Sequence, residues 1–503
     1  MSRSSSFASN TFWSLVLQAV TLIVGFLVPR SIIAFYGSEV NGLVTSLTQF
    51  VQYISLVEAG ISAAAVYALY EPLATNDQDR IDVVVSAAKK FYYKSGWLFV
   101  ALIAVLAFAY PLIVDCGDMS SIQVAVLVAS LGSMGVLDFF TLAKYRVLLT
   151  ASQRNWVIQI GMIIYRLLYA AVIFTLSRLR ISVELVYIVA VFPVIIRTVF
   201  LTLYTKSKFP DVDFNADDHG FKLDQRWDAF LLQILGVVQN GAPIIIATLI
   251  LQDLKMLSVF SIYILIANGV QSLCSSFSNG TQSSFGDVIV RGESGLLKRA
   301  FKEFQTLTYT INALFCGVAF PLINSFVVLY TDDVADTNYC YPIIGFLILL
   351  NVFLYHLKTP QGLLVIAGGM YRSTRYQTVA QTVILLLGSV LFGLVWGVPG
   401  IIIGCCLSNL YRDIDLLFFI PKHLTKTNPI DTGYRMLLSI IKCAIIAVPG
   451  YIFCSMASSW FVWFLQALCL FIWGSIVSIF LCRVFEPAEL TGLVNRVNKI
   501  VRR

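Results

Sequence analysis

Charged side chains are scarce in this sequence. Asp, Glu, Lys and Arg make up 13% of its 503 residues, whereas hydrophobic residues make up 58%. Soluble domains carry roughly 25% charged residues, so this composition excludes a chain that folds wholly in water. The sequence therefore predicts an all-α polytopic membrane protein, because a helix satisfies its own backbone hydrogen bonds in lipid.

The sequence also lacks the patterns that carry metal, redox and nucleotide chemistry. It has three His, and its ten Cys form no C-x-x-C pair. A Cys inside an apolar helix is usually a small packing residue, so we expect no metal site and no disulfide framework. No G-x-x-x-x-G-K-[ST] loop is present, so we expect no cofactor and no ATP-driven step.

What the sequence has in abundance is apolar runs of about 20 residues, the length that crosses a bilayer as a helix. We count fourteen. They cover residues 12–34, 43–70, 91–114, 122–149, 156–177, 181–205, 228–251, 256–281, 304–330, 340–366, 376–397, 399–420, 436–457 and 460–484.

Basic residues predict the orientation of these helices. They gather in alternate connections, and the other connections hold only Arg178, Arg180 and Lys255. Because Lys and Arg are retained on the cytoplasmic side, we expect both termini to be cytoplasmic. The net charge of +7 arises in these loops and does not indicate nucleic acid. The longest outer connection, 331–339, leaves no room for an extracytoplasmic catalytic domain, so we expect no enzyme.

Two halves of the chain correspond at a fixed shift. Arg197 falls on Arg412, 215 residues later, and Leu148 falls on Leu363 at the same shift. Six helices per half give both halves the same orientation, a parallel repeat of two pseudo-symmetric lobes. The predicted domains are an N-terminal lobe (1–205), a cytoplasmic linker (206–227), a C-terminal lobe (228–420), helices 13 and 14 (421–485) and an amphipathic basic tail (486–503).

The tail alternates apolar and basic residues with a helical period. Leu490, Leu493 and Val494 share one face, whereas Arg496 and Lys499 lie on the remainder. We expect an interfacial helix on anionic inner-leaflet lipid. The alternative is a solvated tail.

Several ionisable residues fall inside the apolar runs, where an unpaired charge costs about 2.5–3.5 kcal/mol or more. Each must therefore face protein or water. The cations predict a cavity that attracts an anionic substrate, because guanidinium binds phosphate through two parallel hydrogen bonds. These cations are Arg166, Arg197, Arg412 and Lys358, together with Arg30 at the outer end of the first helix. For Arg30 the alternative is snorkelling to the headgroups.

The acidic residues Glu58 and Asp138 leave two interpretations open. In one, Glu58 and Arg166 lie at matching depth and form an ion pair that fastens the bundle. In the other, Glu58 or Asp138 lines a hydrated cavity and exchanges a proton or a sodium ion.

Two segments resemble a known family. The run Phe35–Ala74 (FYGSEVNGLVTSLTQFVQYISLVEAGISAAAVYALYEPLA), followed by Lys89–Tyr92, resembles the first helix pair of bacterial polysaccharide-biosynthesis flippases. These belong to the multidrug/oligosaccharidyl-lipid/polysaccharide (MOP) exporter superfamily. The segment Tyr145–Arg154 is similar to the inner end of that family's fourth helix.

The resemblance implies a flippase for surface polysaccharide synthesis. Its substrate would be a polyprenyl-pyrophosphate-linked oligosaccharide repeat unit, moved by alternating access from the inner to the outer leaflet of the bacterial plasma membrane. It also implies a two-lobed monomer with a cationic central cavity. The implied partners are membrane lipids and the polysaccharide polymerase or other assembly proteins.

Other functions compete with this one. A multidrug/cation antiporter of the same superfamily would need an acidic cavity, and the excess of Arg in the predicted helices 5, 6 and 12 disfavours it. A membrane glycosyltransferase, such as a polymerase or ligase, would need larger outer loops. A scaffold within an assembly complex is a third alternative.

Overall fold

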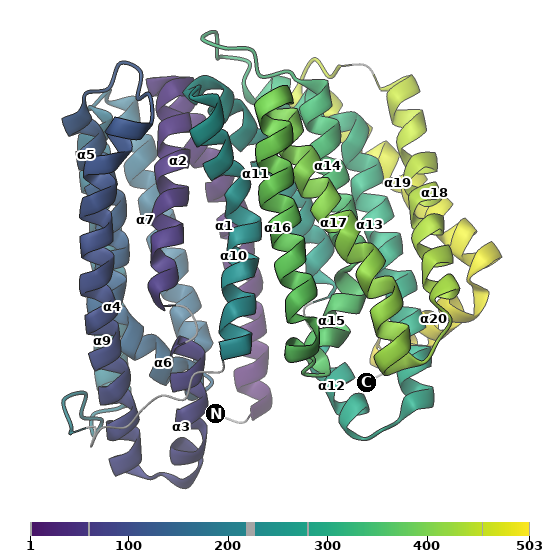
Figure 1. Ribbon diagram of the computed structural model, residues 1–503, viewed down its shortest axis with the longest axis horizontal. Helices are drawn as coiled ribbons and strands as arrows, with labels where there is room; N and C mark the ends of the chain where they lie inside the picture. Colours follow the sequence, from purple (N-terminus) through teal and green to yellow (C-terminus); the bar gives the residue numbers. More distant parts are fainter. Residues whose placement is uncertain (1–2, 59–60, 218–226, 279–280, 455, 502–503) are drawn as a thin grey trace. The chain divides into compact units, whose positions relative to one another are not determined.

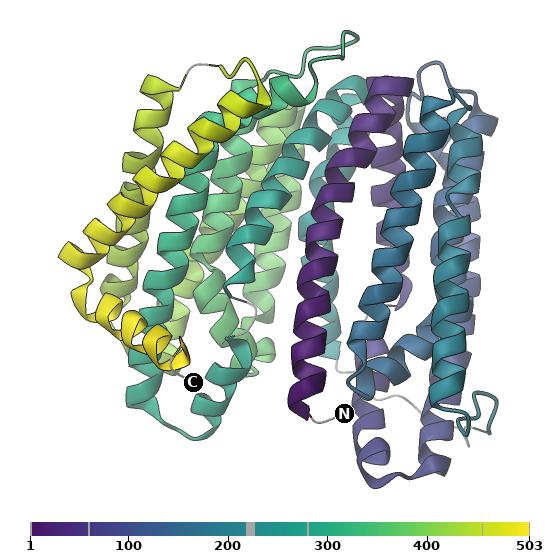
Figure 2. The same ribbon diagram turned by 180° about the vertical axis from the view of Figure 1, so that it is seen from behind.

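The computed structural model describes residues 3–58, 61–217, 227–278, 281–454 and 456–501 (Figures 1 and 2). These residues form helices and connections, without a strand. The first helices are α1 (Arg3–Tyr36), α2 (Ser38–Ile54), α3 (Ile61–Thr75), α4 (Gln78–Ile113), α5 (Ser121–Leu137), α6 (Ala143–Ala151), α7 (Asn155–Arg178), α8 (Val183–Val189), α9 (Phe192–Lys208) and α10 (Trp227–Leu251). The later ones are α11 (Leu254–Ser276), α12 (Gln282–Val290), α13 (Ser294–Tyr330), α14 (Pro342–Leu357), α15 (Thr359–Ala367), α16 (Tyr371–Trp396), α17 (Val398–Ile420), α18 (Pro429–Phe453), α19 (Trp460–Phe485) and α20 (Pro487–Val501).

Twelve segments of the described chain are long and apolar enough to cross a membrane. The all-α polytopic fold predicted from the sequence is confirmed. Of the fourteen predicted helices, 43–70 and 399–420 are not among the twelve. The second of these is α17, which exists as a helix but carries Arg412, Asp413 and Asp415 within one turn of one another.

The prediction of one continuous helix over 43–70 is wrong. Helix α2 ends at Ile54, residues Ser55–Glu58 form a single 3₁₀ turn, and α3 begins at Ile61. The Ser55 hydroxyl donates to the Gln52 carbonyl oxygen at 2.6 Å. Such a local bond competes with the helix ladder, and a 3₁₀ stretch between helices often marks a hinge or a strained site.

Two helices are much longer than predicted. Helix α4 has 36 residues and α13 has 37, whereas the predicted segments began at 91 and 304. At 1.5 Å per residue each is about 55 Å long, well beyond the roughly 30 Å of hydrocarbon in a bilayer. Their polar first turns therefore extend past the membrane. Helix α4 begins where the Asp77 carboxylate accepts a hydrogen bond from the Arg80 amide at 3.1 Å, an N-cap.

The element order repeats along the chain, as the sequence shift predicts. A long helix (α4, α13) is followed by α5 or α14 and then by a nine-residue helix (α6, α15). These nine-residue helices are Ala143–Ala151 and Thr359–Ala367, so the shift between them is within one residue of that between Arg197 and Arg412. The correspondence supports the duplication.

The helices form two compact units, residues Met1–Ser258 and Val259–Arg503. In the first unit α1 packs against α7, α4 against α5, and α10 against α2. In the second, α16 packs against α17, and α18 and α19 both pack against α13. The division lies later than the predicted linker at 206–227, part of which falls outside the described residues, and the predicted domain boundaries stay a prediction.

Each unit has its own apolar core at the end that is predicted to be cytoplasmic. In the first unit, buried side chains of α7 and α9 meet those of α6, with Leu149, Val157 and Leu201 in contact. In the second, Phe301 and Phe304 of α13 pack with Leu364 of α15. These cores hold the helix segments that carry the charged residues described next.

Candidate substrate-binding site

The first unit contains a connected group of four charged side chains. Arg146 Nη2 lies 3.3 Å from both carboxylate oxygens of Glu58. Arg146 Nη1 lies 3.9 Å from Asp138 Oδ2, and Asp138 Oδ1 in turn accepts a hydrogen bond from Arg197 Nη2. The order Glu58–Arg146–Asp138–Arg197 alternates in sign, so each charge has an opposite neighbour. We call these four residues the first charge group.

Irregular helix segments place the two acids of this group. Glu58 ends the 3₁₀ turn between α2 and α3, and Asp138 begins a π turn, Asp138–Leu142, between α5 and α6. A π turn displaces side chains from the regular helical faces and is often found at functional sites. Here it brings Asp138 between Arg146 of α6 and Arg197 of α9.

Arg197 is the most buried member, with 7% of its side chain exposed. Its guanidinium also lies 2.9 Å from the Met162 sulfur and 5.4 Å from the centre of the Tyr165 ring, a cation–π contact. Its Nε has no hydrogen-bond partner among the described residues. One donor is therefore left for a ligand or for water.

Arg166 does not complete the ion pair that the sequence suggested. The observed partner of Glu58 is Arg146. Arg166 lies half-buried on α7, and its Nε is buried without a partner among the described residues. Arg30 lies half-buried on α1, one residue after Pro29. The roles predicted for both cations stay proposals.

The sequence alone gives Arg146 no partner. Its charge groups it with the basic residues of a predicted cytoplasmic connection, which indicate the topology and nothing more. The signal was present, because Arg146 lies inside the predicted segment 122–149 and eight residues after Asp138. An intramembrane acid needs a cation nearby, and Arg146 is the first arginine after Asp138 in the sequence.

The second unit contains a similar group on α17 and on the junction of α14 with α15. Arg412 Nη1 lies 2.6 Å from Asp415 Oδ2, and 8% of the Arg412 side chain is exposed. Lys358 Nζ donates to Asn409 Oδ1 at 2.5 Å, and the Asn409 amide donates to Asn351 at 2.8 Å. With Asp413, the residues Lys358, Arg412 and Asp415 form what we call the second charge group.

Asp413 is the exceptional member of the second charge group. It is buried, and neither of its carboxylate oxygens has a hydrogen-bond partner among the described residues. Lys358 is near enough to interact with it electrostatically. A buried carboxylate without hydrogen bonds is costly, so this one needs a cation, a proton or a water molecule.

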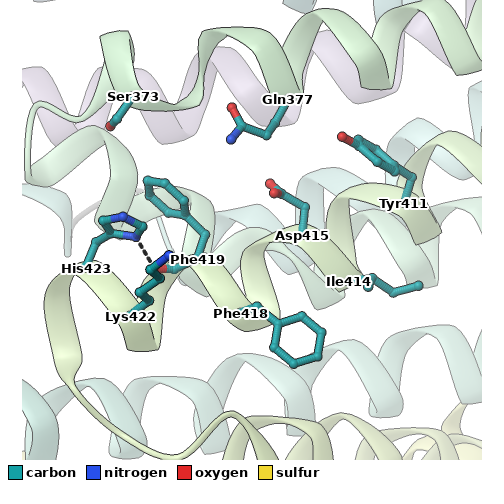
Figure 3. A pocket seen from close by; sticks show the side chains of 9 residues that line it. All are labelled: Ser373, Gln377, Tyr411, Ile414, Asp415, Phe418, Phe419, Lys422 and His423. Carbon is teal, nitrogen blue, oxygen red and sulfur yellow. Dashed lines mark hydrogen bonds between the residues drawn. The ribbon is translucent and has the colours of Figure 1, made fainter.

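A pocket of about 560 Å³ opens beside Asp415 (Figure 3). Helix α17 contributes Tyr411, Asp415 and Phe418, and α16 contributes Gln377. At one end the His423 ring stacks on Phe419, with ring centres 4.3 Å apart, and its Nδ1 donates to the Phe419 carbonyl oxygen at 3.0 Å. Aromatic walls with a few polar groups are typical of small-molecule sites.

The two charge groups share one electrostatic property. Each holds two cations and two acids and is neutral when all are ionised. Arg197 and Arg412 are therefore not unpaired cations. An anionic ligand would have to displace the Asp138 carboxylate from Arg197, or the Asp415 carboxylate from Arg412. It would then accept the hydrogen bonds that the arginine donates to that carboxylate.

No protein-family model matches the sequence, and no curated protein matches it. Several solved structures have the same fold. The structure titled "Lipid II flippase MurJ, inward closed conformation" is 15% identical, with a TM-score of 0.65 over 95% of this chain and 100% of that one.

Two multidrug transporters are also similar. An inward-facing multidrug resistance MATE family transporter of the MOP superfamily gives a TM-score of 0.60 at 13% identity, covering 84% of this chain and 96% of that one. The MATE multidrug transporter DinF-BH gives 0.57 at 13% identity, covering 85% and 98%. This chain is therefore a polytopic membrane protein that shares its fold with a lipid II flippase and with a multidrug transporter of the MOP superfamily, and this is the fold that the resemblance in its sequence predicted.

Proposed function

We propose that this protein is a flippase that moves a polyprenyl-pyrophosphate-linked oligosaccharide from the inner to the outer leaflet of the plasma membrane. The fold it shares with a lipid II flippase supports transport of a lipid-linked substrate. The segments Phe35–Ala74 and Tyr145–Arg154, similar to polysaccharide-biosynthesis flippases, support an oligosaccharide as the cargo.

The observation that carries the proposal is a pair of buried arginines at equivalent positions of the repeat. Arg197 and Arg412 lie 215 residues apart in sequence, and each is paired with a carboxylate. A planar guanidinium fits two oxygens of a diphosphate as well as it fits a carboxylate. The carboxylates would hold the arginines in position between transport cycles and give way to the substrate.

The same geometry suggests how transport is coupled to an ion. A diphosphate that takes Arg197 leaves Asp138 without its nearest cation, which favours a proton or Na⁺ on that carboxylate. Glu58 stands in the same relation to Arg146. We propose that substrate binding and ion uptake are linked through these acids, without ATP.

The remaining expectations belong to the same proposal. The protein would be a non-enzymatic, monomeric transporter of the bacterial inner membrane with both termini in the cytoplasm. Its partners would be membrane lipids and the polymerase or assembly proteins of the polysaccharide. Arg166, Lys358 and Arg30 would add positive charge along the substrate path.

One observation favours a second candidate, an antiporter of organic cations. Asp413 is a buried carboxylate without a hydrogen-bond partner among the described residues, which is what a cationic drug would require. Two multidrug transporters share the fold. An efflux assay with a cationic dye, comparing Asp413→Asn with the parent, tests this candidate directly.

The flippase is tested in a strain that lacks the gene. Lipid-linked repeat units should accumulate on the inner leaflet, and the parent gene should restore export. Arg197→Ala and Arg412→Ala should each reduce export at least about tenfold, because each removes charge-assisted hydrogen bonds of about 1.5–3 kcal/mol. The matched control is Arg178→Ala, an exposed arginine at the end of α7.

The outcomes separate the candidates. Normal glycan export in the strain that lacks the gene would refute the proposal that the protein is a flippase. Full complementation by both arginine variants would leave a flippase but remove the arginines from its site. Dye efflux that disappears with Asp413→Asn, in cells whose glycan export is normal, would establish the antiporter instead.

A further inference from the structure

A second pocket of about 560 Å³ lies outside both charge groups, in the second unit. Its walls are the first turns of α13, the start of α18 and the start of α20. Four cations line it: Lys298, Arg299, Lys302 and Lys426. Helix α20 follows α19 at a sharp turn of the chain (Figure 2) and packs against α13, and its residues Ala488 and Glu489 line the pocket.

The acids around this pocket are already engaged. Glu303 binds Arg299 at 3.1 Å and Arg496 of α20 at 2.6 Å. Asp431 binds Lys302 at 3.2 Å. These ion pairs hold the walls of the pocket in place. Because both carboxylates are already paired, they do not neutralise the remaining lysines of the pocket.

The third acid is engaged in the same way. Glu489 of α20 binds Arg435 of α18 at 2.8 Å, and Arg435 is itself buried. Gly492, one turn further along α20, lies so close to Glu303 that a Cβ there would be 2.3 Å from its carboxylate oxygen. Helix α20 is therefore seated tightly, and the pocket is a built feature of the fold.

Two lysines of the pocket have no acidic partner among the described residues. Within the described residues, no ion pair or hydrogen bond engages the ammonium groups of Lys298 and Lys426. Lys426 is exposed, and Lys298 is half-buried on α13. Two ammonium groups that share one cavity repel each other unless an anion lies between them.

The backbone at Lys426 is held in an unusual conformation. Its φ is 49°, in the left-handed region, directly after the π turn Pro421–Thr425. A side chain other than Gly or Asn is disfavoured there by roughly 1 kcal/mol or more. The turn therefore fixes the place from which the Lys426 side chain extends to the pocket.

We propose that this pocket binds a phosphate-bearing anion, namely the headgroup of an anionic membrane phospholipid, through Lys298 and Lys426. The pocket lies at the first turns of α13 and α20, on the side that the basic loops predict to be cytoplasmic, and α20 also carries the exposed apolar side chain of Val494. A phosphate drawn from free solution would satisfy the same two ammonium groups, so the test separates the two sources. The inference does not depend on what the protein transports.

The test is native mass spectrometry of the full-length protein in detergent, titrated with phosphatidylglycerol. Lys298→Ala combined with Lys426→Gly should weaken binding at least about tenfold, since two charge contacts are lost. Glycine relieves the left-handed backbone, so this substitution removes the ammonium group without straining the turn. The matched control is Lys206→Ala with Lys208→Ala, two exposed lysines at the end of α9.

Parallel titrations use phosphatidylcholine and inorganic phosphate. Weak binding of phosphatidylcholine, with loss of phosphatidylglycerol only in the pocket variant, would support the lipid. Inorganic phosphate that competes at equal concentration would support the phosphate site with a soluble ligand. Equal phosphatidylglycerol binding by parent and pocket variant, or equal binding of phosphatidylcholine, would overturn the proposal.

Discussion

At the scale of single residues, the ion pairs of the first unit are linked through one arginine. Arg146 contacts the carboxylates of both Glu58 and Asp138, and the three side chains are each about one quarter to one third exposed. Removing the shared cation leaves Glu58 without an ion-pair partner and Asp138 with Arg197 alone, and an uncompensated half-buried charge is costly.

We therefore predict that Arg146→Ala lowers the free energy of unfolding by about 1–3 kcal/mol, because Glu58 loses its ion-pair partner and Asp138 keeps Arg197 alone. Reversible denaturation in detergent measures it. Adding Glu58→Gln to this variant should recover part of the loss, since one uncompensated charge is then removed. If Arg146→Ala and the double variant lose the same free energy of unfolding, Arg146 and Glu58 are not coupled in solution.

Cys116 offers a pH-dependent measurement outside the membrane-spanning helices. It lies between α4 and α5, where burial and the adjacent Asp115 raise the pKa of its thiol to about 11. Only the thiolate reacts with alkylating reagents. Because the pKa is raised, the thiolate is a small fraction at neutral pH and grows as pH increases.

With Cys116 as the single cysteine, we predict an alkylation rate that rises about tenfold per pH unit from about pH 7 to about pH 9, without a plateau. Asp115→Asn should increase the rate at any pH in this range, because it removes the negative charge and keeps the oxygen that accepts from the Gly117 amide. A rate that rises only about three- to fivefold between about pH 8 and about pH 9 in the parent would show that the thiol has an ordinary pKa.

At the scale of elements, the α16–α17 pair depends on small residues. Gly400 and Gly404 lie one turn apart on α17, a G-x-x-x-G spacing that lets two helices approach closely. A Cβ at Gly404 would lie 2.2 Å from the Ser389 backbone nitrogen of α16. The Ser389 hydroxyl donates to the Ile401 carbonyl oxygen at 3.0 Å, which adds a polar bond across the contact.

Gly404→Val should therefore force the two helices apart and destabilise the second unit by about 3 kcal/mol or more, as overpacking does. Thermal unfolding in detergent is the readout. The control is Gly362→Ala on α15, where nothing lies within 4 Å of the added Cβ and helix propensity should improve by about 0.5–1 kcal/mol. Similar stability of Gly404→Val and Gly362→Ala would refute the close packing.

The elements also show where sequence patterns succeed and fail. Apolar runs located the helices because lipid makes hydrophobic length decisive. They missed the break after Ile54, since the residues on both sides are apolar and the interruption is a matter of local hydrogen bonding. They also missed the first turns of α4 and α13, which are polar and extend past the membrane.

At the scale of the whole molecule, the repeat was the most informative sequence pattern. It predicted that Arg197 and Arg412 are equivalent, and both are buried and paired. It could not identify their partners: Asp138 lies 59 residues before Arg197, whereas Asp415 lies three after Arg412. Partners in a packed bundle depend on helix rotation and on local π or 3₁₀ turns, which a single sequence does not encode visibly.

Orientation in the membrane is a property of the whole chain, and two positions test it. Cys340 lies half-buried in the connection between α13 and α14, on the predicted outer side. Ser207 lies exposed near the end of α9, between the basic residues Lys206 and Lys208 on the predicted cytoplasmic side. Moving such a basic connection across the bilayer is strongly disfavoured.

In spheroplasts, a membrane-impermeant maleimide should label a protein that retains Cys340 as its single cysteine. A cysteine-free protein that carries Ser207→Cys should stay unlabelled until the membrane is permeabilised. The cysteine-free protein is the blank for both. Labelling of Ser207→Cys before permeabilisation would place the basic connections outside. The predicted cytoplasmic termini would then be wrong, and the inner leaflet could not be the side from which the charge groups and the lysine pocket take their ligands.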